Sequence, residues 1–174
     1  MSIEKQTVEL LKSKKLKLAT AESCTGGLIA KRLTDIPGAS QVFLGGVVSY
    51  TNHVKQQVLR VPENLLARCG AVSAEVARAM ALGVRVLTGA DLAVSVTGLA
   101  GPDGDDRGNP VGTVFVALST PERTAVRRMM SKGEMLAMPE TTTIMAAMGV
   151  MLAMMLVAKC TGMMRFTAAK AVLP

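Results

Sequence analysis

The sequence predicts a three-layer α/β domain, in which helices cover both faces of one sheet. Short β-branched segments alternate along the chain with segments whose apolar residues recur at helical spacing. The chain has 174 residues and 49% of them are hydrophobic, which suffices for one folded domain with its own core. We therefore expect a single domain over residues 1–174.

In the first half, the spacing of apolar residues predicts each element. Residues 4–12 have the spacing of an amphipathic helix, residues 16–20 alternate as a strand does, and residues 28–33 return to helical spacing. Residues 42–50 are apolar and β-branched with a glycine pair, which predicts a buried strand. A short helix follows it, capped by residues 51–52.

The second half continues the alternation. Helices are predicted over residues 62–69 and 73–87. A glycine closely follows each of them, and Ser73 is a good N-cap for the second. β-branched strands are predicted over residues 92–96 and 111–118. Helices and strands thus alternate as an α/β domain requires.

Ser23 lies at the predicted corner between the first strand and the second helix. Glycines 26 and 27 let the backbone pass close to a ligand, and the free N–H groups of a first helical turn carry partial positive charge. A serine hydroxyl there could attack a carbonyl while those N–H groups receive the developing oxyanion. The alternative is that Ser23 or Thr25 only caps the helix.

A second stretch carries a phenol and an amine. Tyr50 at the end of a strand and Lys55 on the next helical turn can converge on one pocket. A lysine acts as a base only when its pKa is lowered by burial or by a nearby cation, since its ordinary pKa is about 10.4. The alternative is that Lys55 is an ordinary solvated lysine.

Four segments in order resemble the CinA C-terminal domain family, the nicotinamide-nucleotide amidohydrolases. The family pattern A-E-S-C-T-G-G matches residues 21–27, S-Y-x-N-x-x-K matches 49–55, and T-G-x-A-G-P-x-G matches 97–104. Residues 109–114 also follow the family style, and the resemblance covers about residues 3–128. It implies a mixed sheet of about five strands.

The resemblance also implies a reaction and roles for residues. Ser23 would be the nucleophile, Lys55 its general base and Tyr50 a polar partner in the proton transfers. The backbone N–H groups near Thr25 and Gly26 are candidates for the oxyanion hole. The implied reaction converts nicotinamide mononucleotide to nicotinate mononucleotide with release of ammonia.

A glycine-rich loop over residues 98–108 is the candidate substrate cradle. Its backbone N–H groups could meet a phosphate or ribose, and its acidic residues favour the end nearer Thr97 as the ligand side. We expect Gly27, Thr97, Gly98 and Gly101 to bind substrate. The alternative is a mobile polar connection.

Charge and composition restrict the partners. The formal net charge is +7 and the pI about 9.7, which would attract a phosphate-bearing small molecule. Only 2% of the residues are aromatic, so little base-stacking surface exists and nucleic acid is not expected. No phosphate-loop or dinucleotide motif occurs, and we expect no cofactor.

The cysteines and the histidine indicate neither a metal site nor a disulfide framework. Cys24, Cys69 and Cys160 form no C-x-x-C pair, and His53 is the single histidine. The odd thiol count and the lack of a secretory signal favour the cytoplasm. A rival nucleophile is Cys24, with His53 as its base.

From about residue 129 the sequence departs from the family. Only two of its 13 methionines precede residue 129, and Met135 and Pro139 stand where the family has arginines. Residues 144–158 carry no charge but are fewer than the about 20 that span a bilayer, so we expect a buried helix and no membrane association.

Two function classes therefore stay open. One is an active amidohydrolase; the other is a catalytically silent member that binds a nucleotide or forms an oligomer. The abrupt change of composition is also what a reading-frame shift would produce. For either class we expect a homodimer, the commonest soluble homo-oligomer.

Overall fold

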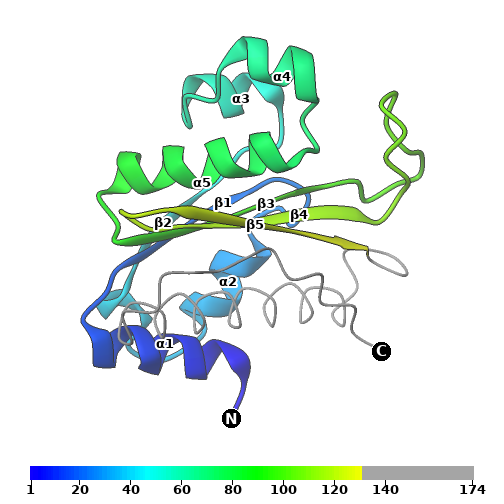
Figure 1. The fold of residues 1–174 in the computed structure, drawn as a ribbon. Coiled ribbons are helices and arrows are strands. Elements are labelled where there is room, and N and C mark those ends of the chain that lie inside the picture. The colour runs from blue at the N-terminus through cyan, green and yellow to red at the C-terminus, as the bar shows by residue number, and fades with distance from the viewer. Residues whose placement is uncertain (131–174) are drawn as a thin grey trace.

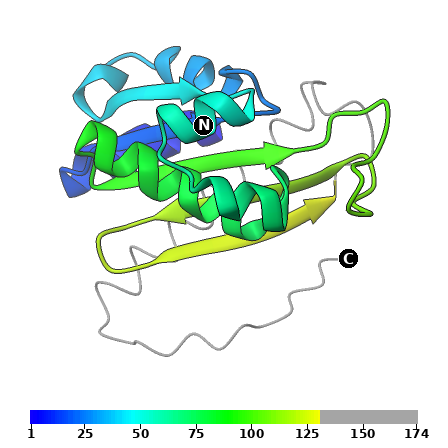
Figure 2. The same cartoon turned by 90° about the horizontal axis from the view of Figure 1, so that it is seen from above.

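A mixed five-stranded sheet forms the centre of the computed structural model, which describes residues 1–130 (Figure 1). The strand order is β2-β1-β3-β4-β5, which Figure 2 shows from above. β1 pairs in parallel with β2 and β3, while β3–β4 and β4–β5 are antiparallel. The expected α/β fold and mixed sheet are confirmed. The strands are β1 (Leu18–Glu22), β2 (Phe43–Val48), β3 (Leu92–Gly98), β4 (Thr113–Ser119) and β5 (Thr124–Met130).

Helices cover both faces of this sheet (Figure 1). α1 and α2 lie on one face and α3, α4 and α5 on the other. Apolar clusters fill the space between helices and sheet. The larger two include Val8, Ile29 and Val94 on one side and Met80 and Ala93 on the other. The helices are α1 (Ile3–Lys14), α2 (Leu28–Thr34), α3 (Asn52–Gln57), α4 (Glu63–Cys69) and α5 (Ala74–Thr88), with a short 3-10 helix, η1 (Ala39–Gln41), before β2.

The predicted start of α3 and both predicted ends of α5 agree with the structure, because their expected caps are made. Thr51 Oγ1 accepts a hydrogen bond from Val54 N at 3.3 Å and starts α3, and Ser73 Oγ does the same for α5. Gly89 ends α5 with φ of 68°, a left-handed conformation that suits glycine. Local capping chemistry alone was enough to place these boundaries.

Two strands differ from expectation. β2 is an edge strand with alternately half-buried and exposed residues, whereas its apolar sequence predicts a buried strand. β5 has no counterpart among the strands predicted from spacing. Arg127 and Arg128 interrupt its apolar pattern, and Arg128 lies over the Phe115 ring at 5.9 Å. Neighbouring strands, not local propensity, therefore define both segments.

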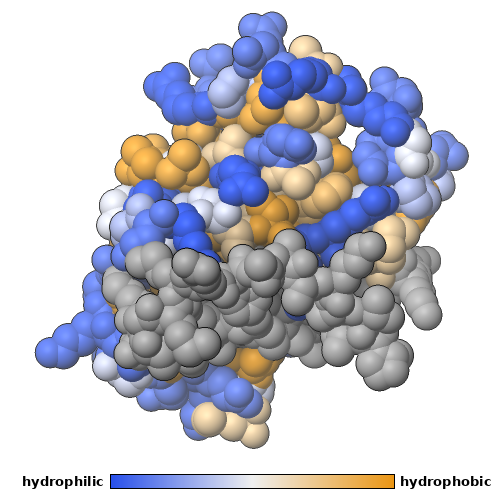
Figure 3. All heavy atoms as spheres, viewed as in Figure 1, coloured by the Kyte–Doolittle hydropathy of each residue, from blue (hydrophilic) through white to orange (hydrophobic). Residues whose placement is uncertain are grey.

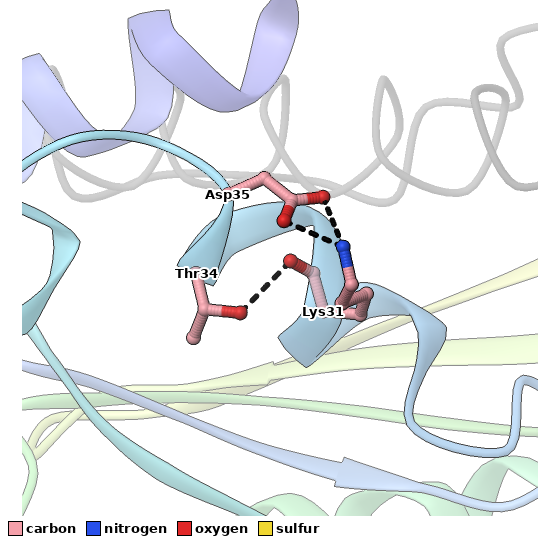
Figure 4. Close-up of polar contacts among 3 residues, drawn as sticks. All are labelled: Lys31, Thr34 and Asp35. Atoms are coloured by element: carbon pink, nitrogen blue, oxygen red, sulfur yellow. Dashed lines mark hydrogen bonds and ion pairs between the residues drawn. The ribbon is translucent and has the colours of Figure 1, made fainter.

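The exposed side of α2 is polar. Lys31 Nζ donates to both carboxylate oxygens of Asp35 at 2.6 and 2.7 Å, and Thr34 Oγ1 donates to the Lys31 carbonyl at 2.9 Å (Figure 4). Both partners of the ion pair are more than half exposed, so its net contribution to stability is small. This face of α2 is simply solvated.

Some expectations concern the remaining residues. The positions Met135 and Pro139 and the uncharged segment 144–158 lie outside the described residues. Within residues 1–130, no helix is long and apolar enough to cross a membrane.

Candidate active site

Ser23 directly follows β1, at the edge of the sheet where the parallel strands β1, β2 and β3 end. Its N–H donates to the Val96 carbonyl of β3 at 2.9 Å, so the sheet fixes its backbone. The residue is 7% exposed. In sheets with parallel strands, ligands bind beyond the carboxyl ends, which is where this hydroxyl lies.

Lys55 of α3 meets Ser23 at this edge. Its Nζ lies 3.0 Å from Ser23 Oγ and donates to the Ser49 carbonyl at 2.6 Å. The residue is only 1% exposed, and this burial lowers its pKa from 10.5 to about 8. The structure therefore brings the predicted hydroxyl and amine together.

The Ser49 carbonyl orients the Lys55 amine by accepting a hydrogen bond from it. An uncharged amine has two N–H bonds and one lone pair. When one N–H donates to Ser49 O, the lone pair can accept the Ser23 proton across the 3.0 Å contact. Ser49 itself is completely buried, and its N–H donates to the Glu22 carbonyl at 2.7 Å.

The Glu22 side chain binds the turn that follows Ser23. Its carboxylate is 1% exposed. It accepts hydrogen bonds from Thr25 Oγ1 at 2.7 Å and from the N–H groups of Gly27, Ile29 and Ala30 at 3.2, 3.0 and 2.8 Å. A buried carboxylate thus satisfies the N-terminal turn of α2.

This contact corrects the expectation of free N–H groups and excludes the alternative that Ser23 or Thr25 caps the helix. The first-turn N–H groups of α2 are not free, because they bind Glu22. Neither Ser23 nor Thr25 caps the helix; the N-cap is Gly27, and it has no side-chain hydrogen bond. The N–H of Gly26 donates to the Ser23 carbonyl at 3.1 Å, so it is used within the turn.

Cys24, the rival nucleophile, has a thiol suited to packing. Burial raises its pKa to about 12, although the N–H groups of Cys24 and Thr25 and the Lys55 charge act in the opposite direction. A thiol with this pKa is almost wholly protonated near neutral pH. His53, its suggested base, is exposed. The electrostatics therefore favour Ser23 over Cys24.

Tyr50 is not enclosed with the pair. Its side chain is 73% exposed, whereas Ser23 and Lys55 are buried. Among residues 1–130, no hydrogen bond to its phenol is found. The structure thus places this predicted partner on the surface that follows β2 and not in contact with the hydroxyl and amine.

The four predicted substrate-binding residues have different surroundings. Gly98 lies against the nucleophile turn: a Cβ there would come within 3.2 Å of Cys24 Sγ and 2.7 Å of the Thr113 carbonyl. The buried Thr97 hydroxyl donates to the Ala71 carbonyl at 2.8 Å and so ties β3 to the segment before α5.

The other two predicted residues are glycines with positive φ. The N–H of Gly27 binds Glu22, and Gly101 is exposed in the loop after β3 with φ of 98°. Gly98 and Gly27 thus lie beside the two residues next to Ser23, namely Cys24 and Glu22.

Sequence reasoning missed the roles of Glu22 and Ser49. Both stand inside the quoted motif segments, but their contacts are tertiary: one carboxylate folds back onto a helix, and one carbonyl accepts a lysine. An acidic residue just before a strand-to-helix turn was the available signal for Glu22.

Other features lie apart from this site. An apolar groove of about 980 Å³ lies between α5, α4 and the segment that joins α3 to α4. Its lining includes Leu65, Leu82 and Val86 but no predicted site residue. Figure 3 shows apolar surface over this part of the molecule. Among residues 1–130, no group of three His, Cys, Asp or Glu side chains could hold a metal ion.

Comparison with curated proteins gives the family. The model of the CinA C-terminal domain matches residues 1–155, a range that extends beyond residue 128, where the motif resemblance ends. A CinA-like protein of Geobacter sulfurreducens is 50% identical over 145 residues, which make up 83% of this chain and 35% of that relative. A CinA-like protein of a Synechococcus strain is 64% identical over 99 residues, 57% of this chain and 23% of that relative. The chain thus spans about a third or less of the length of these relatives.

Solved structures of similar length share the fold. A competence-damaged protein (CinA) superfamily protein from Klebsiella pneumoniae has a TM-score of 0.82 at 34% identity, covering 87% of this chain and 96% of that chain. The competence/damage inducible protein CihA from Agrobacterium tumefaciens has a TM-score of 0.75 at 35% identity, over 90% of this chain and 93% of that chain. The chain belongs to the CinA C-terminal domain family.

Proposed function

We propose that this protein is an amidohydrolase that converts nicotinamide mononucleotide to nicotinate mononucleotide and ammonia through a Ser-Lys acyl-enzyme mechanism. One observation carries the proposal: a buried lysine amine with a pKa of about 8 lies 3.0 Å from a serine hydroxyl. The choice of substrate follows from the resemblance of the motif segments to the nicotinamide-nucleotide amidohydrolases. The net charge of +7 would attract the phosphate of nicotinamide mononucleotide.

Acylation begins with the uncharged amine of Lys55. It takes the Ser23 proton as Oγ forms a bond to the carboxamide carbon, and the carbonyl oxygen becomes an oxyanion. The resulting ammonium of Lys55 then gives its proton to the amide nitrogen, the C–N bond breaks and ammonia leaves. In the second half, Lys55 takes a proton from water as the water oxygen attacks the acyl carbon. The bond between that carbon and Ser23 Oγ then breaks, nicotinate mononucleotide leaves, and the Lys55 ammonium returns the proton to Ser23 Oγ.

The oxyanion needs donors outside the first turn of α2. The N–H of Gly26 is used in the turn, and those of Gly27 and Ile29 bind Glu22. We assign this role to the N–H of Thr25, which approaches the weakly accepting Cys24 sulfur. A well-placed donor is worth about 3 kcal/mol of transition-state stabilisation.

Tyr50 keeps its proposed role as a polar partner in the proton transfers. The side chain is 73% exposed, and we propose that it joins the reacting groups when substrate covers this surface. Its phenol would then donate to the departing nitrogen or to the substrate itself. We propose that the end of β3 at Gly98 forms the side of the substrate site opposite Tyr50.

A catalytically silent nucleotide binder is the second candidate. The family arginines that Met135 and Pro139 replace are suited to hold a phosphate or to close the active site, and their absence favours the loss of turnover that this candidate requires. Binding of nicotinamide mononucleotide without turnover, measured by calorimetry, would support it. If replacing Met135 and Pro139 with arginine restored turnover, the lack of activity would be due to these two positions.

Ammonia release from nicotinamide mononucleotide tests the proposal. Ser23→Ala and Lys55→Met should each lower kcat by about 10³-fold or more while circular dichroism stays native, because each removes one half of the activated nucleophile. Cys24→Ala is the matched control, since its thiol neighbours the same groups, and it should keep activity within about threefold. A folded Ser23→Ala variant with normal turnover would refute the proposal.

A further inference from the structure

The Glu22 side chain is enclosed by donors from one turn. One carboxylate oxygen accepts from Thr25 Oγ1 and from the N–H groups of Gly27 and Ile29. The other accepts from Ala30 N at 2.8 Å and lies 3.4 Å from Thr20 Oγ1. The contacts extend from β1 across the nucleophile turn into α2, so one side chain determines the path of the backbone after Ser23.

The main chain of Glu22 is tied to the base as well. Its carbonyl accepts the N–H of Ser49 at 2.7 Å and the Ser49 hydroxyl at 3.3 Å. The Ser49 carbonyl in turn holds Lys55 Nζ at 2.6 Å. Glu22 therefore connects the turn that carries the hydroxyl with the residue that aims the amine.

We propose that Glu22 is a positioning residue of the acyl-transfer site, whose carboxylate holds the 23–27 turn so that the Ser23 hydroxyl faces Lys55. This inference rests on the proposed function. Glu22 would touch neither the substrate nor the reacting atoms. It acts through Ser23, and the rate of nucleophilic attack is what it controls.

The glutamine variant is the informative change because it keeps the shape of the side chain. A carboxylate offers two acceptor oxygens, whereas an amide offers one acceptor and one donor. In Glu22→Gln the NH₂ group must face either Ala30 N or the donors of Thr25, Gly27 and Ile29. One side of the turn then loses its partner, yet no cavity is created.

Leu33→Ala is the matched control in the same helix. Leu33 is 1% exposed and packs in the core beneath α2, so its truncation destabilises the helix without touching the turn. If Glu22 contributes only to stability, the two variants should behave alike in their folded state.

The experiment measures the covalent reaction of Ser23 with an alkyl fluorophosphonate, which needs no natural substrate. In this reaction Ser23 Oγ bonds to phosphorus, the P–F bond breaks, fluoride leaves and Lys55 takes the proton. We expect Glu22→Gln to lower the limiting rate of labelling by about 10²-fold with the probe's half-saturation within about twofold. Leu33→Ala should label at the native rate when folded, and Ser23→Ala not at all.

Each outcome decides the assignment. Native-rate labelling of folded Glu22→Gln would overturn it and leave the proposed function intact. An equal loss in Leu33→Ala would also overturn it, because the effect would then be general to α2. Labelling of the native protein without ammonia release would refute the proposed substrate but not the role of Glu22. A native protein that reacts with neither reagent would refute both.

Discussion

At the residue scale, the proposed function depends on an amine that the fold keeps out of water. Lys55 is 1% exposed, and the only partners found for its amine among residues 1–130 are a hydroxyl and a carbonyl, Ser23 and Ser49. No carboxylate within residues 1–130 holds it in the charged state, so burial dominates and the pKa falls to about 8. Burial would let Lys55 act as a base, and the same burial lowers the stability of the folded state.

That cost predicts how stability depends on pH. The folded-state pKa of Lys55 is about 8 and its ordinary value 10.5, so between these values the unfolded chain binds more protons and stability rises with pH. Relative to Lys55→Met, the free energy of unfolding of the native protein should increase by about 3 kcal/mol from pH 7 to pH 10.5. Denaturant titrations of both proteins measure it. A constant difference across this range would show that Lys55 is not desolvated.

The proximity of Ser23 and Lys55 was predictable, but the other contacts around them were not. Motif spacing singles out Ser23 and Lys55, and the structure brings them together. The carboxylate of Glu22 reaches residues five to eight positions later, and the Ser49 carbonyl meets a side chain six positions later. Such contacts depend on the direction that the backbone takes at the turn. Composition and periodicity do not predict that direction.

At the element scale, close approaches between elements constrain the fold that carries the site. Gly83 lies within α5, and a Cβ there would collide with the Leu59 carbonyl in the segment that follows α3. α5 can approach this segment, and therefore the helix that carries Lys55, only because the side chain is absent.

Gly83→Ala should therefore lower stability although alanine favours helices. The helical gain is about 1 kcal/mol, whereas overpacking against backbone costs about 1–3 kcal/mol. We expect a net loss of about 1 kcal/mol in thermal denaturation. Leu82→Ala, at a neighbouring position 46% exposed, should change stability by less. An increase of the melting temperature in Gly83→Ala would contradict the close approach.

Helix boundaries were the most predictable elements and the sheet margins the least. Thr51, Ser73 and Gly89 act within their own turns, so local sequence was sufficient. β2 and β5 lie at the two margins of the sheet, where one neighbour instead of two selects the residues. Apolar character alone consequently failed to distinguish an edge strand from a buried one.

At the scale of the whole molecule, we expect the charge of the chain to act on the proposed substrate. A net charge of +7 attracts a phosphate-bearing ligand over a distance that salt shortens to about 10 Å at 0.1 M ionic strength. The expected homodimer and the single-domain organisation over residues 1–174 stay predictions at this scale. Sedimentation equilibrium measures the first and limited proteolysis the second.

The KM for nicotinamide mononucleotide should therefore rise several-fold between about 0.02 M and about 0.5 M salt, because screening weakens the attraction of substrate. The value of kcat should stay constant, since the buried Ser23–Lys55 contact is screened little. Steady-state kinetics at several salt concentrations separates the two parameters. A salt-independent KM would show that net charge has no part in substrate capture.

The pH dependence of Ser23 labelling tests most directly whether uncharged Lys55 activates the hydroxyl. From about pH 6 the rate with a fluorophosphonate should rise tenfold per pH unit and level off above the Lys55 pKa of about 8, and Lys55→Met should remove this profile. A rate that keeps rising to about pH 10.5, or an unchanged profile in Lys55→Met, would contradict the account.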